Sequence, residues 1–401
     1  MNRSILVAAV AALLAMASGC IAFLGLRQIV RARARSRMDM LAATWEDYKR
    51  NHWDRVSGRT VDEGLTTSEG QSYTLLRSAW QGDRATFDKT WQWTRENLQH
   101  RSDHLFSWLF GRRRDGGEGI LTERHGESAA SDADTDIAFA LLLAYGRWGD
   151  GTYLEQAKDV IDDLWKYEVV HVRGLPYLAA DDRSQKGPFL DLNPSYLSPY
   201  AYRYFARVNS EHDWLAVVDT SYDLLARCLS SPLGGPRSAG LPPDWMRMDR
   251  ATGEISPSLD SSRATDYGWD AIRTTWRIGV DLQWNDEPRA RLVLRRMSFL
   301  SRALRQDGKL YAAYGHDGVI KARYESAAAY GCSLAYFLAA DPSQAERIWR
   351  TKLVSLYDPS RHAWKVPLGY YPDNWVWFGL ALHEHRLKDF IQILPPGGEL
   401  P

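Results

Sequence analysis

The sequence predicts an all-α fold, an (α/α)6 barrel in which six inner helices are surrounded by six outer helices. After residue 38, amphipathic helix patterns alternate with Gly, Asp, Asn and Pro breaks, and the alternating patterns typical of strands are few. A helix–break–helix unit also recurs along the chain. Such pairs bury their apolar faces only against neighbouring pairs, so they stack into an open solenoid or close into a ring. The apolar halves of the units suit the inner wall of a ring.

The composition excludes several classes of protein. The chain has 401 residues, with 50 Lys and Arg against 50 Asp and Glu, and this balance argues against a nucleic-acid partner. Hydrophobic residues at 45% exclude a disordered chain. Cys20, Cys228 and Cys332 are too far apart for a disulfide framework or a cysteine zinc site. The 17 Trp and 20 Tyr residues either fill a large helical core or line a groove for sugar rings.

The N-terminal segment is predicted to be separate from the barrel. Residues 5–26 form an uncharged apolar run, and about 20 such residues span a bilayer. We expect an uncleaved transmembrane anchor, with a signal peptide as the alternative. Five arginines follow the run, and the positive-inside rule would place the following domain in the cytoplasm. The predicted organisation is an anchor with a basic stretch over 1–37 and a globular domain over 38–401.

The helical units can be followed in order along the chain. The complete units lie at 72–93, 137–165, 199–228, 271–300 and 327–349. An apolar helix around 374–384 supplies a sixth inner member, and a helix around 39–49 supplies its outer partner. Long connections run from outer to inner helices, at about 101–131, 169–193, 231–266 and 305–323. Long loops on one face of a rigid scaffold usually carry the functional site.

Three acidic clusters lie at the predicted starts of inner helices, around Glu69, around Asp132 and Asp134, and around Asp270. Helix capping alone would explain any one of them. In a ring, however, equivalent helix starts converge on one mouth. Hydrolysis of a glycosidic bond needs such a set, because one acid protonates the leaving oxygen and a second carboxylate activates water or attacks directly.

Two of these carboxylates are the best candidates for the two roles. Glu69 lies near Tyr73, and an apolar, aromatic surrounding can keep a glutamic acid protonated near neutral pH. Asp270 is followed one helical turn later by Arg273, which would hold a basic carboxylate ionised and oriented. The alternative for Asp270 and Arg273 is a plain ion pair at i and i+3.

Four stretches of the chain resemble conserved blocks of glycoside hydrolase family eight. Residues 130–148 (ASDADTDIAFALLLAYGRW) resemble its signature, and residues 68–73 (SEGQSY) resemble its general-acid segment. Residues 193–196 (NPSY) and 269–273 (WDAIR) resemble two further blocks. The blocks occur in the family's order, and the resemblance covers about residues 45–390.

The resemblance implies an inverting endo-hydrolase of β-1,4-linked glycans, such as a cellulase or endo-β-1,4-glucanase, on an (α/α)6 barrel. By the matching blocks, Glu69 is the expected proton donor and Asp270 the expected base. Asp132 matches the signature aspartate and would bind the distorted sugar beside the scissile bond. The expected substrate-binding residues are Tyr196, Arg273, Tyr73, Asp134 and Trp269. No cofactor or metal is implied, because His171, His212 and His316 are scattered and no HExxH motif occurs.

Members of this family occur in two settings. Some are secreted cellulases and xylanases, and others are encoded with exopolysaccharide synthesis machinery. The predicted anchor, together with the lack of a carbohydrate-binding module, favours the second setting. The expected partners are then a polysaccharide, the inner membrane and a synthase or export complex. The catalytic domain is expected in the periplasm or outside the cell, secreted if the N-terminal segment is cleaved, against the positive-inside rule.

Two alternatives stay open. The domain is either an enzyme or a catalytically idle glycan-binding or scaffold subunit of an exopolysaccharide synthase, which would use its aromatic groove alone. A barrel of the same architecture acting on uronic-acid oligosaccharides, or as a lyase, is a second alternative. Such a site would offer a His/Tyr or Arg cluster.

Overall fold

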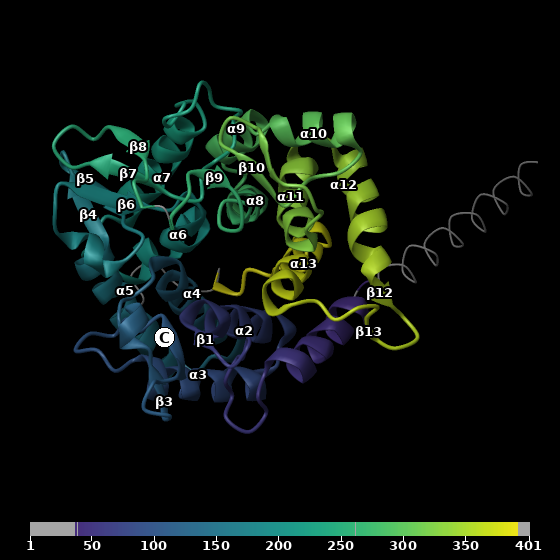
Figure 1. Ribbon diagram of the computed structural model, residues 1–401. Coiled ribbons are helices and arrows are strands. Elements are labelled where there is room, and N and C mark those ends of the chain that lie inside the picture. Colours follow the sequence, from purple (N-terminus) through teal and green to yellow (C-terminus); the bar gives the residue numbers. More distant parts are fainter. Residues whose placement is uncertain (1–36, 38, 261, 392–401) are drawn as a thin grey trace, which may run out of the picture.

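The computed structural model describes residues 37, 39–260 and 262–391, and this part of the chain is mostly helical (Figure 1). In Figure 1 the chain runs once around a ring, from purple at the bottom through teal and green to yellow. This arrangement confirms the prediction of an all-α barrel. Helices buried almost all round form its inner layer, as expected of elements packed on both sides.

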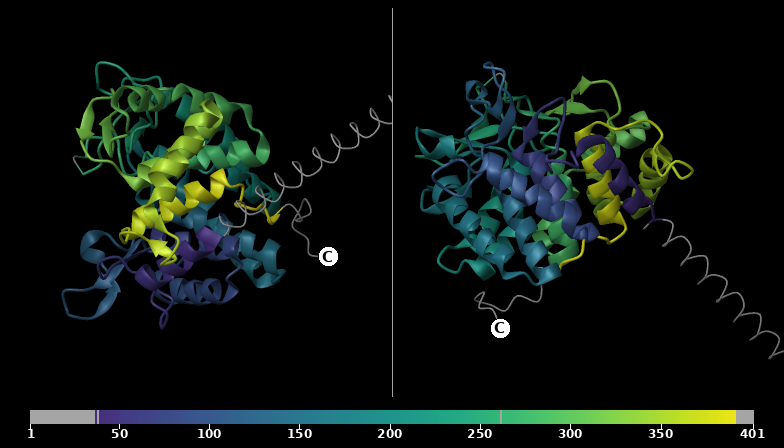
Figure 2. Two further views of the ribbon diagram at one scale, coloured as in Figure 1. Left: turned by 90° about the vertical axis from the view of Figure 1, so that its right-hand side faces the viewer. Right: turned by 90° about the horizontal axis from the view of Figure 1, so that it is seen from below.

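Six helices of the described residues form the inner layer. They are α2 (Ser68–Gln81), α4 (Ser131–Trp148), α6 (Pro199–Val208), α8 (Arg273–Asn285), α11 (Ala327–Ala340) and α13 (Tyr370–His383). Each contacts the next along the chain. The ring closes where the buried Arg77 of α2 donates to Asp373 of α13, Nη1 to Oδ1, at 3.0 Å. In Figures 1 and 2 the yellow α13 lies beside the purple helix of residues 39–52, and Trp377 donates to the Leu41 carbonyl oxygen at 3.0 Å.

The outer helices bury one face each. They are the helix of residues 39–52, α3 (Arg84–Leu98), α5 (Gly151–Glu168), α7 (Trp214–Cys228), α9 (Pro288–Arg296), α10 (Phe299–Asp307) and α12 (Pro342–Ile348). A π-helical turn, Trp349–Leu353, and a 3-10 turn, Val354–Leu356, continue α12. The outer half of the fourth predicted unit is thus two helices, α9 and α10, which are separated by Met297 and Ser298.

Short antiparallel strands brace the long connections. One three-stranded sheet consists of β1 (Thr66–Thr67), β2 (Leu109–Arg112) and β3 (Glu118–Ile120). A two-stranded sheet consists of β4 (Val169–Val172) and β5 (Leu175–Leu178). Two further three-stranded sheets consist of β6 (Phe189–Leu192), β7 (Met246–Asp249) and β8 (Ile255–Pro257), and of β9 (Asp266–Tyr267), β10 (Ala313–Gly315) and β11 (Ile320–Ala322). A last pair is β12 (Tyr357–Asp358) with β13 (Ala363–Trp364). With two to four residues each, they are too short to give an alternating pattern. Three 3-10 turns, Thr122–Arg124, Asp182–Gln185 and Pro194–Tyr196, lie in the same connections. Pairing of β1 with β2 and of β9 with β10 fixes the chain just before α2 and α8.

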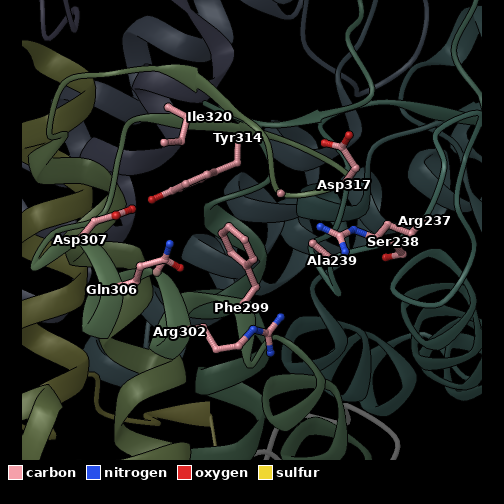
Figure 3. A pocket seen from close by; sticks show the side chains of 12 residues that line it. Arg237, Ser238, Ala239, Phe299, Arg302, Gln306, Asp307, Tyr314, Asp317 and Ile320 are labelled. Carbon is pink, nitrogen blue, oxygen red and sulfur yellow. The ribbon is translucent and has the colours of Figure 1, made fainter.

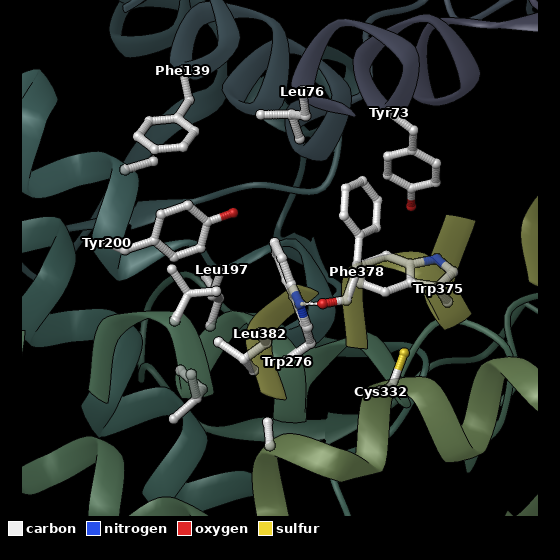
Figure 4. Packing of buried hydrophobic residues seen from close by; sticks show 14 of the residues in the cluster. Tyr73, Leu76, Phe139, Leu197, Tyr200, Trp276, Cys332, Trp375, Phe378 and Leu382 are labelled. Atoms are coloured by element: carbon white, nitrogen blue, oxygen red, sulfur yellow. Dashed lines mark hydrogen bonds between the residues drawn. The ribbon is translucent and has the colours of Figure 1, made fainter. Parts of the chain in front are cut away.

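Aromatic side chains from the inner helices meet on the axis of the ring (Figure 4). Trp276 of α8 lies 5.2 Å from Phe378 and 5.5 Å from Trp375 of α13, and its Nε1 donates to the Phe378 carbonyl oxygen at 2.9 Å. Tyr73 of α2 contacts Trp375 edge-on at 5.4 Å. Many of the numerous Trp and Tyr residues therefore fill the core, which was one of the two interpretations of the composition.

The predicted membrane anchor over 5–26 lies outside the described residues, as does Cys20. Among the helices that the structure does describe, none is both long and apolar enough to cross a bilayer. Cys228 and Cys332 are buried and free.

Candidate active site

The three predicted carboxylates lie at the starts of inner helices. Glu69 is the second residue of α2, Asp132 is the second residue of α4, and Asp270 lies three residues before α8. Capping does not explain Glu69, because the Thr67 side chain accepts the Gly70 N–H there. All three carboxylates point to the same end of the ring, where a single guanidinium binds them.

Arg273 is that binding group. It is fully buried, and its Nη1 donates to Glu69 Oε2 at 2.6 Å and to Asp132 Oδ2 at 3.0 Å. Its Nη2 donates to Asp270 Oδ1 at 2.6 Å, and Nη1 also reaches the Tyr73 hydroxyl at 3.2 Å. The contact between Arg273 and Asp270 is therefore part of a network and more than a local i, i+3 pair. Carboxylates from α2, α4 and the loop before α8 are held around one charge, in bonds stronger than those between neutral groups.

Glu69 and Asp270 each have a second donor and remain partly open to solvent. The Tyr370 hydroxyl, at the start of α13, donates to Glu69 Oε1. Trp245 Nε1 donates to Asp270 Oδ2 at 3.0 Å. The side chains of Glu69 and Asp270 are 25% and 30% exposed, so both carboxyl groups can meet a ligand while their orientation is fixed.

Asp132 differs from the other two because it is only 2% exposed. Burial raises the pKa of Asp132, the Glu69 charge adds to this, and the neighbouring Arg273 lowers it. Its Oδ1 accepts the N–H of Ala133 at 2.9 Å, and Oδ2 faces Arg273. Asp132 is thus a buried, hydrogen-bonded acid at the bottom of the cluster.

Aromatic rings and two depressions flank the carboxylates. The Arg273 guanidinium lies 5.2 Å from the ring centre of Tyr196, which contacts Trp245 edge-on at 5.8 Å. Trp269 is 47% exposed and contacts Tyr371 edge-on at 6.0 Å. A depression of about 360 Å³ includes Tyr196 and Trp245 in its wall, and a smaller one of about 100 Å³ includes Thr67, Gly70 and Tyr370. Apolar ring faces with polar edges suit sugar rings.

A second buried ion pair joins two of the helices that carry the site. One helical turn after Arg273, the buried Arg277 donates to both oxygens of Asp136, at 2.7 and 2.8 Å. This bidentate pair joins α8 to α4. It fixes the relative position of the helices that carry Arg273 and Asp132.

The structure does not bring Asp134 into the cluster. Two residues along an α-helix turn a side chain by roughly 200°, so Asp134 faces away from Asp132. Its Oδ1 accepts the N–H of Phe106 at 2.9 Å. Burial raises the pKa of Asp134 and that of the fully buried Glu168, and the Asp134 charge adds to the rise at Glu168. Asp134 therefore belongs to the packing between α4 and the end of α5.

Sequence reasoning missed four residues of the site. Tyr370 and Tyr371 are the first two residues of the sixth inner helix. Their position at the start of a repeated inner helix, equivalent to that of Glu69, could have predicted that they lie in the site. Trp245 and Asp244 lie in the long connection before α8, where no repeat or motif points to them. Asp244 Oδ1 accepts three backbone N–H groups beside Asp270. Burial, with the Asp270 charge, raises the pKa of Asp244 to about 7.

A larger cavity lies away from the carboxylates. It measures about 410 Å³ and is lined by Phe299, Arg302 and Gln306 of α10 with Tyr314 and Asp317 (Figure 3). The two smaller depressions differ from it because each includes a residue that donates to a cluster carboxylate, Trp245 to Asp270 and Tyr370 to Glu69. In residues 37, 39–260 and 262–391, no group of three or more His, Cys, Asp or Glu side chains is arranged to hold a metal ion.

Comparison with known proteins gives a family match over most of the chain. The model of glycosyl hydrolases family 8 matches residues 19–371. Endoglucanase A of Acetivibrio thermocellus is 30% identical over 263 residues, which cover 63% of this chain and 51% of that protein. An endoglucanase of Escherichia coli is 30% identical over 264 residues, covering 63% and 65%. The match thus spans between half and two thirds of the length of these relatives.

Solved structures share the fold over nearly their whole length. An endo-1,4-D-glucanase of Vibrio fischeri has a TM-score of 0.68 at 25% identity, covering 84% of this chain and 93% of that one. A β-1,3-1,4-glucanase of a Paenibacillus species has a TM-score of 0.73 at 22% identity, covering 88% and 92%. Because similar folds carry different glycan specificities, the fold alone does not select the polymer.

Proposed function

The chain belongs to glycosyl hydrolase family 8, and on that premise we propose that it is an endo-acting hydrolase that cleaves β-1,4-linked glucan with inversion. The observation that carries the proposal is the binding of Glu69, Asp132 and Asp270 by the single buried Arg273. The names of its relatives, endoglucanases and an endo-1,4-D-glucanase, support a β-1,4-glucan as substrate. The same names support an endo mode of cleavage.

In the proposed reaction, Glu69 protonates the leaving glycosidic oxygen. Tyr370 and Arg273 fix the side chain from two directions. Asp270 accepts a proton from the water that attacks the anomeric carbon from the opposite face.

The bridging guanidinium limits how far apart the two groups lie. Contacts of 2.6 Å from its two terminal nitrogens hold Glu69 Oε2 and Asp270 Oδ1 within roughly 8 Å of each other. An inverting pair needs about 6.5–9.5 Å to leave room for water, and a retaining pair about 5–5.5 Å. Distances of both kinds fall below this limit, so the stereochemistry of the product decides between them.

Asp132 and the aromatic rings would hold the sugar at the scissile bond. Asp132, buried beside Arg273, accepts a hydrogen bond from a sugar hydroxyl as the ring distorts towards the transition state. Tyr196 and Trp269 offer apolar faces to neighbouring sugars. Arg273 and Tyr73 keep the acids in place from below.

The proposal extends to the architecture and the setting. We assign the all-α barrel as an (α/α)6 barrel within the predicted domain of residues 38–401, with the helix of residues 39–52 as the sixth outer helix. Trp377, which donates to the Leu41 carbonyl oxygen, supports this place. The link to polysaccharide synthesis or export, and a periplasmic or extracellular location, remain predictions that depend on residues 1–37.

Two measurements test the function. The purified protein is incubated with carboxymethylcellulose, glucomannan, xylan and chitosan, and new reducing ends are counted. On the active substrate, proton NMR then follows the first product. We expect cleavage of the β-1,4-glucan with the α-anomer appearing first. A β-anomer appearing first would contradict inversion, and binding without any new reducing ends would favour the idle glycan-binding alternative.

A further inference from the structure

We propose that Asp244 is a positioning residue for the base, Asp270. The inference rests on the proposed function, in which Asp270 activates water. Asp244 lies 26 residues before Asp270, in the long connection between α7 and α8. Its Oδ1 accepts the backbone N–H groups of Gly268 at 3.2 Å, Asp270 at 2.9 Å and Ala271 at 2.6 Å.

The backbone around Asp270 needs such an acceptor. Asp270 lies in a turn between β9 and α8, and N–H groups before a helix have no partner within it. Within this turn, the backbone N–H of Ile272 donates to the Gly268 carbonyl oxygen and that of Arg273 to the Asp270 carbonyl oxygen. These hydrogen bonds do not use the N–H groups of residues 268, 270 and 271. One carboxylate oxygen of Asp244 satisfies all three, and buried N–H groups without partners are costly.

The neighbour of Asp244 holds the side chain of the same base. Trp245 Nε1 donates to Asp270 Oδ2 at 3.0 Å, while Arg273 occupies Oδ1. The segment 244–245 is itself tied down, since its two backbone N–H groups donate to the carbonyl oxygens of Asp266 at 2.6 Å and Ala264 at 3.0 Å. Movement of Asp244 would therefore change both the backbone and the side chain of Asp270.

A glycine makes the close contact with Asp244. A Cβ placed on Gly268 would lie 2.4 Å from Asp244 Oδ2, well inside van der Waals distance. The φ of Gly268 is not in the left-handed region, so alanine is excluded there only by the Asp244 carboxylate. Gly268→Ala therefore disturbs the same contact from the opposite side without changing a charge.

The experiment compares Asp244→Ala, Asp244→Asn and Gly268→Ala with wild type. Asp266→Asn is the matched control, because it removes a nearby carboxylate that lies 3.7 Å from Lys321 and accepts none of the three N–H groups. For each protein, kcat and KM are measured on carboxymethylcellulose and cellohexaose. Hydrogen exchange of the peptide covering 266–272 is followed by mass spectrometry, and thermal melting reports on folding.

Asp244→Ala and Gly268→Ala are expected to lower kcat by about 100-fold with little change in KM, as for a misplacement of roughly 1 Å. Asp244→Asn keeps an oxygen acceptor and should lose less. In Asp244→Ala the peptide 266–272 should exchange at least about tenfold faster, since three hydrogen bonds are lost. Asp266→Asn should stay within about twofold of wild type in both measurements.

Two results would overturn the inference: wild-type kcat in Asp244→Ala, or unchanged exchange of the peptide 266–272. If Asp244→Ala fails to fold, Asp244→Asn and Gly268→Ala decide by the same two measurements. If the wild-type protein itself cleaves none of the glucans, the proposed function fails. Exchange then still decides whether Asp244 holds the turn that carries Asp270.

Discussion

At the scale of single residues, the site is a set of acids held around Arg273, and each acid has a different environment. Glu69 is partly open and contacts a tyrosine hydroxyl, Asp270 contacts an indole N–H, and Asp132 is buried. Different environments are how enzymes assign different roles to chemically similar groups. Substitutions at the three positions should therefore give three distinguishable results.

Asp132→Asn should lower turnover by about 100-fold or more and leave the fold intact. The amide keeps the volume but removes a charge that acts mainly in the transition state. The measurement is kcat on the active glucan together with the melting temperature. Wild-type turnover at unchanged melting would reduce Asp132 to a helix-start residue.

Glu69→Gln and Asp270→Asn should differ in their dependence on the leaving group. Glu69→Gln should abolish cleavage of natural glycans but keep activity on β-glycosides whose leaving group needs no proton. Asp270→Asn should fail on both substrates, because no base remains to activate water. Rates on both substrates are compared for both variants. If the two variants respond in the same way, the assignment of acid and base is wrong.

Glu168 should make stability depend on pH. Burial raises its pKa well above the ordinary value of 4.5, with Asp134, Asp182 and Asp181 adding to the effect. The folded protein then binds more protons than the unfolded chain. The stability from the neutral form is complete below pH 4.5 and is lost as the pH rises through the raised pKa.

The measurement is the melting temperature at pH 5 and pH 8. It should fall more in the wild type than in Glu168→Gln, which cannot ionise. Glu155→Gln, an exposed position on the same helix, should respond to pH as the wild type does. An equal fall in Glu168→Gln and the wild type would show that Glu168 does not ionise in this range.

At the scale of elements, a close backbone contact joins α11 to α13. A Cβ on Gly331 would lie 2.2 Å from the Trp375 carbonyl oxygen, and one on Gly379 would lie 2.2 Å from the Gly331 carbonyl oxygen. The two helices therefore pack backbone to backbone, which only glycine permits. This contact places the start of α13, and with it Tyr370, opposite Glu69.

Gly331→Ala should destabilise the protein by about 1–3 kcal/mol, the usual cost of overpacking. This loss should appear although alanine favours a helix by roughly 1 kcal/mol over glycine. Chemical denaturation gives the free energy of unfolding. Gly369→Ala is the control, because a Cβ there would lie 3.7 Å from its nearest neighbour, Pro372. Equal stability of Gly331→Ala and wild type would contradict the close packing.

At the scale of the whole molecule, the barrel is expected to fold without the N-terminal segment. Among the described residues, the buried core begins at Met40 and includes Trp45, and the ring closes through Arg77 and Asp373. A fragment of residues 38–401 should therefore be soluble and monomeric, with the helical circular dichroism of a folded barrel. Light scattering and circular dichroism check this. Aggregation with loss of helical signal would show that residues 1–37 pack into the domain.

Much of the fold and part of the site follow from local patterns in the sequence. Helix periodicity repeats every few residues, so the paired helices were predictable, as was the position of Glu69 and Asp132 at helix starts. Arg273 follows Asp270 by one helical turn, and their contact could be expected from spacing alone. These features need only the geometry of one helix.

The other contacts of the site depend on how the ring closes. Tyr370 meets Glu69 across 301 positions of sequence, and Arg273 joins acids 141 and 204 positions away. Trp245 and Asp244 come from a connection whose strands are too short to give a pattern. Asp134 carries the same signal as Asp132, yet it faces the opposite side of α4. Which side of a helix faces the mouth, and which loop meets it, depends on contacts between distant segments that no local pattern encodes.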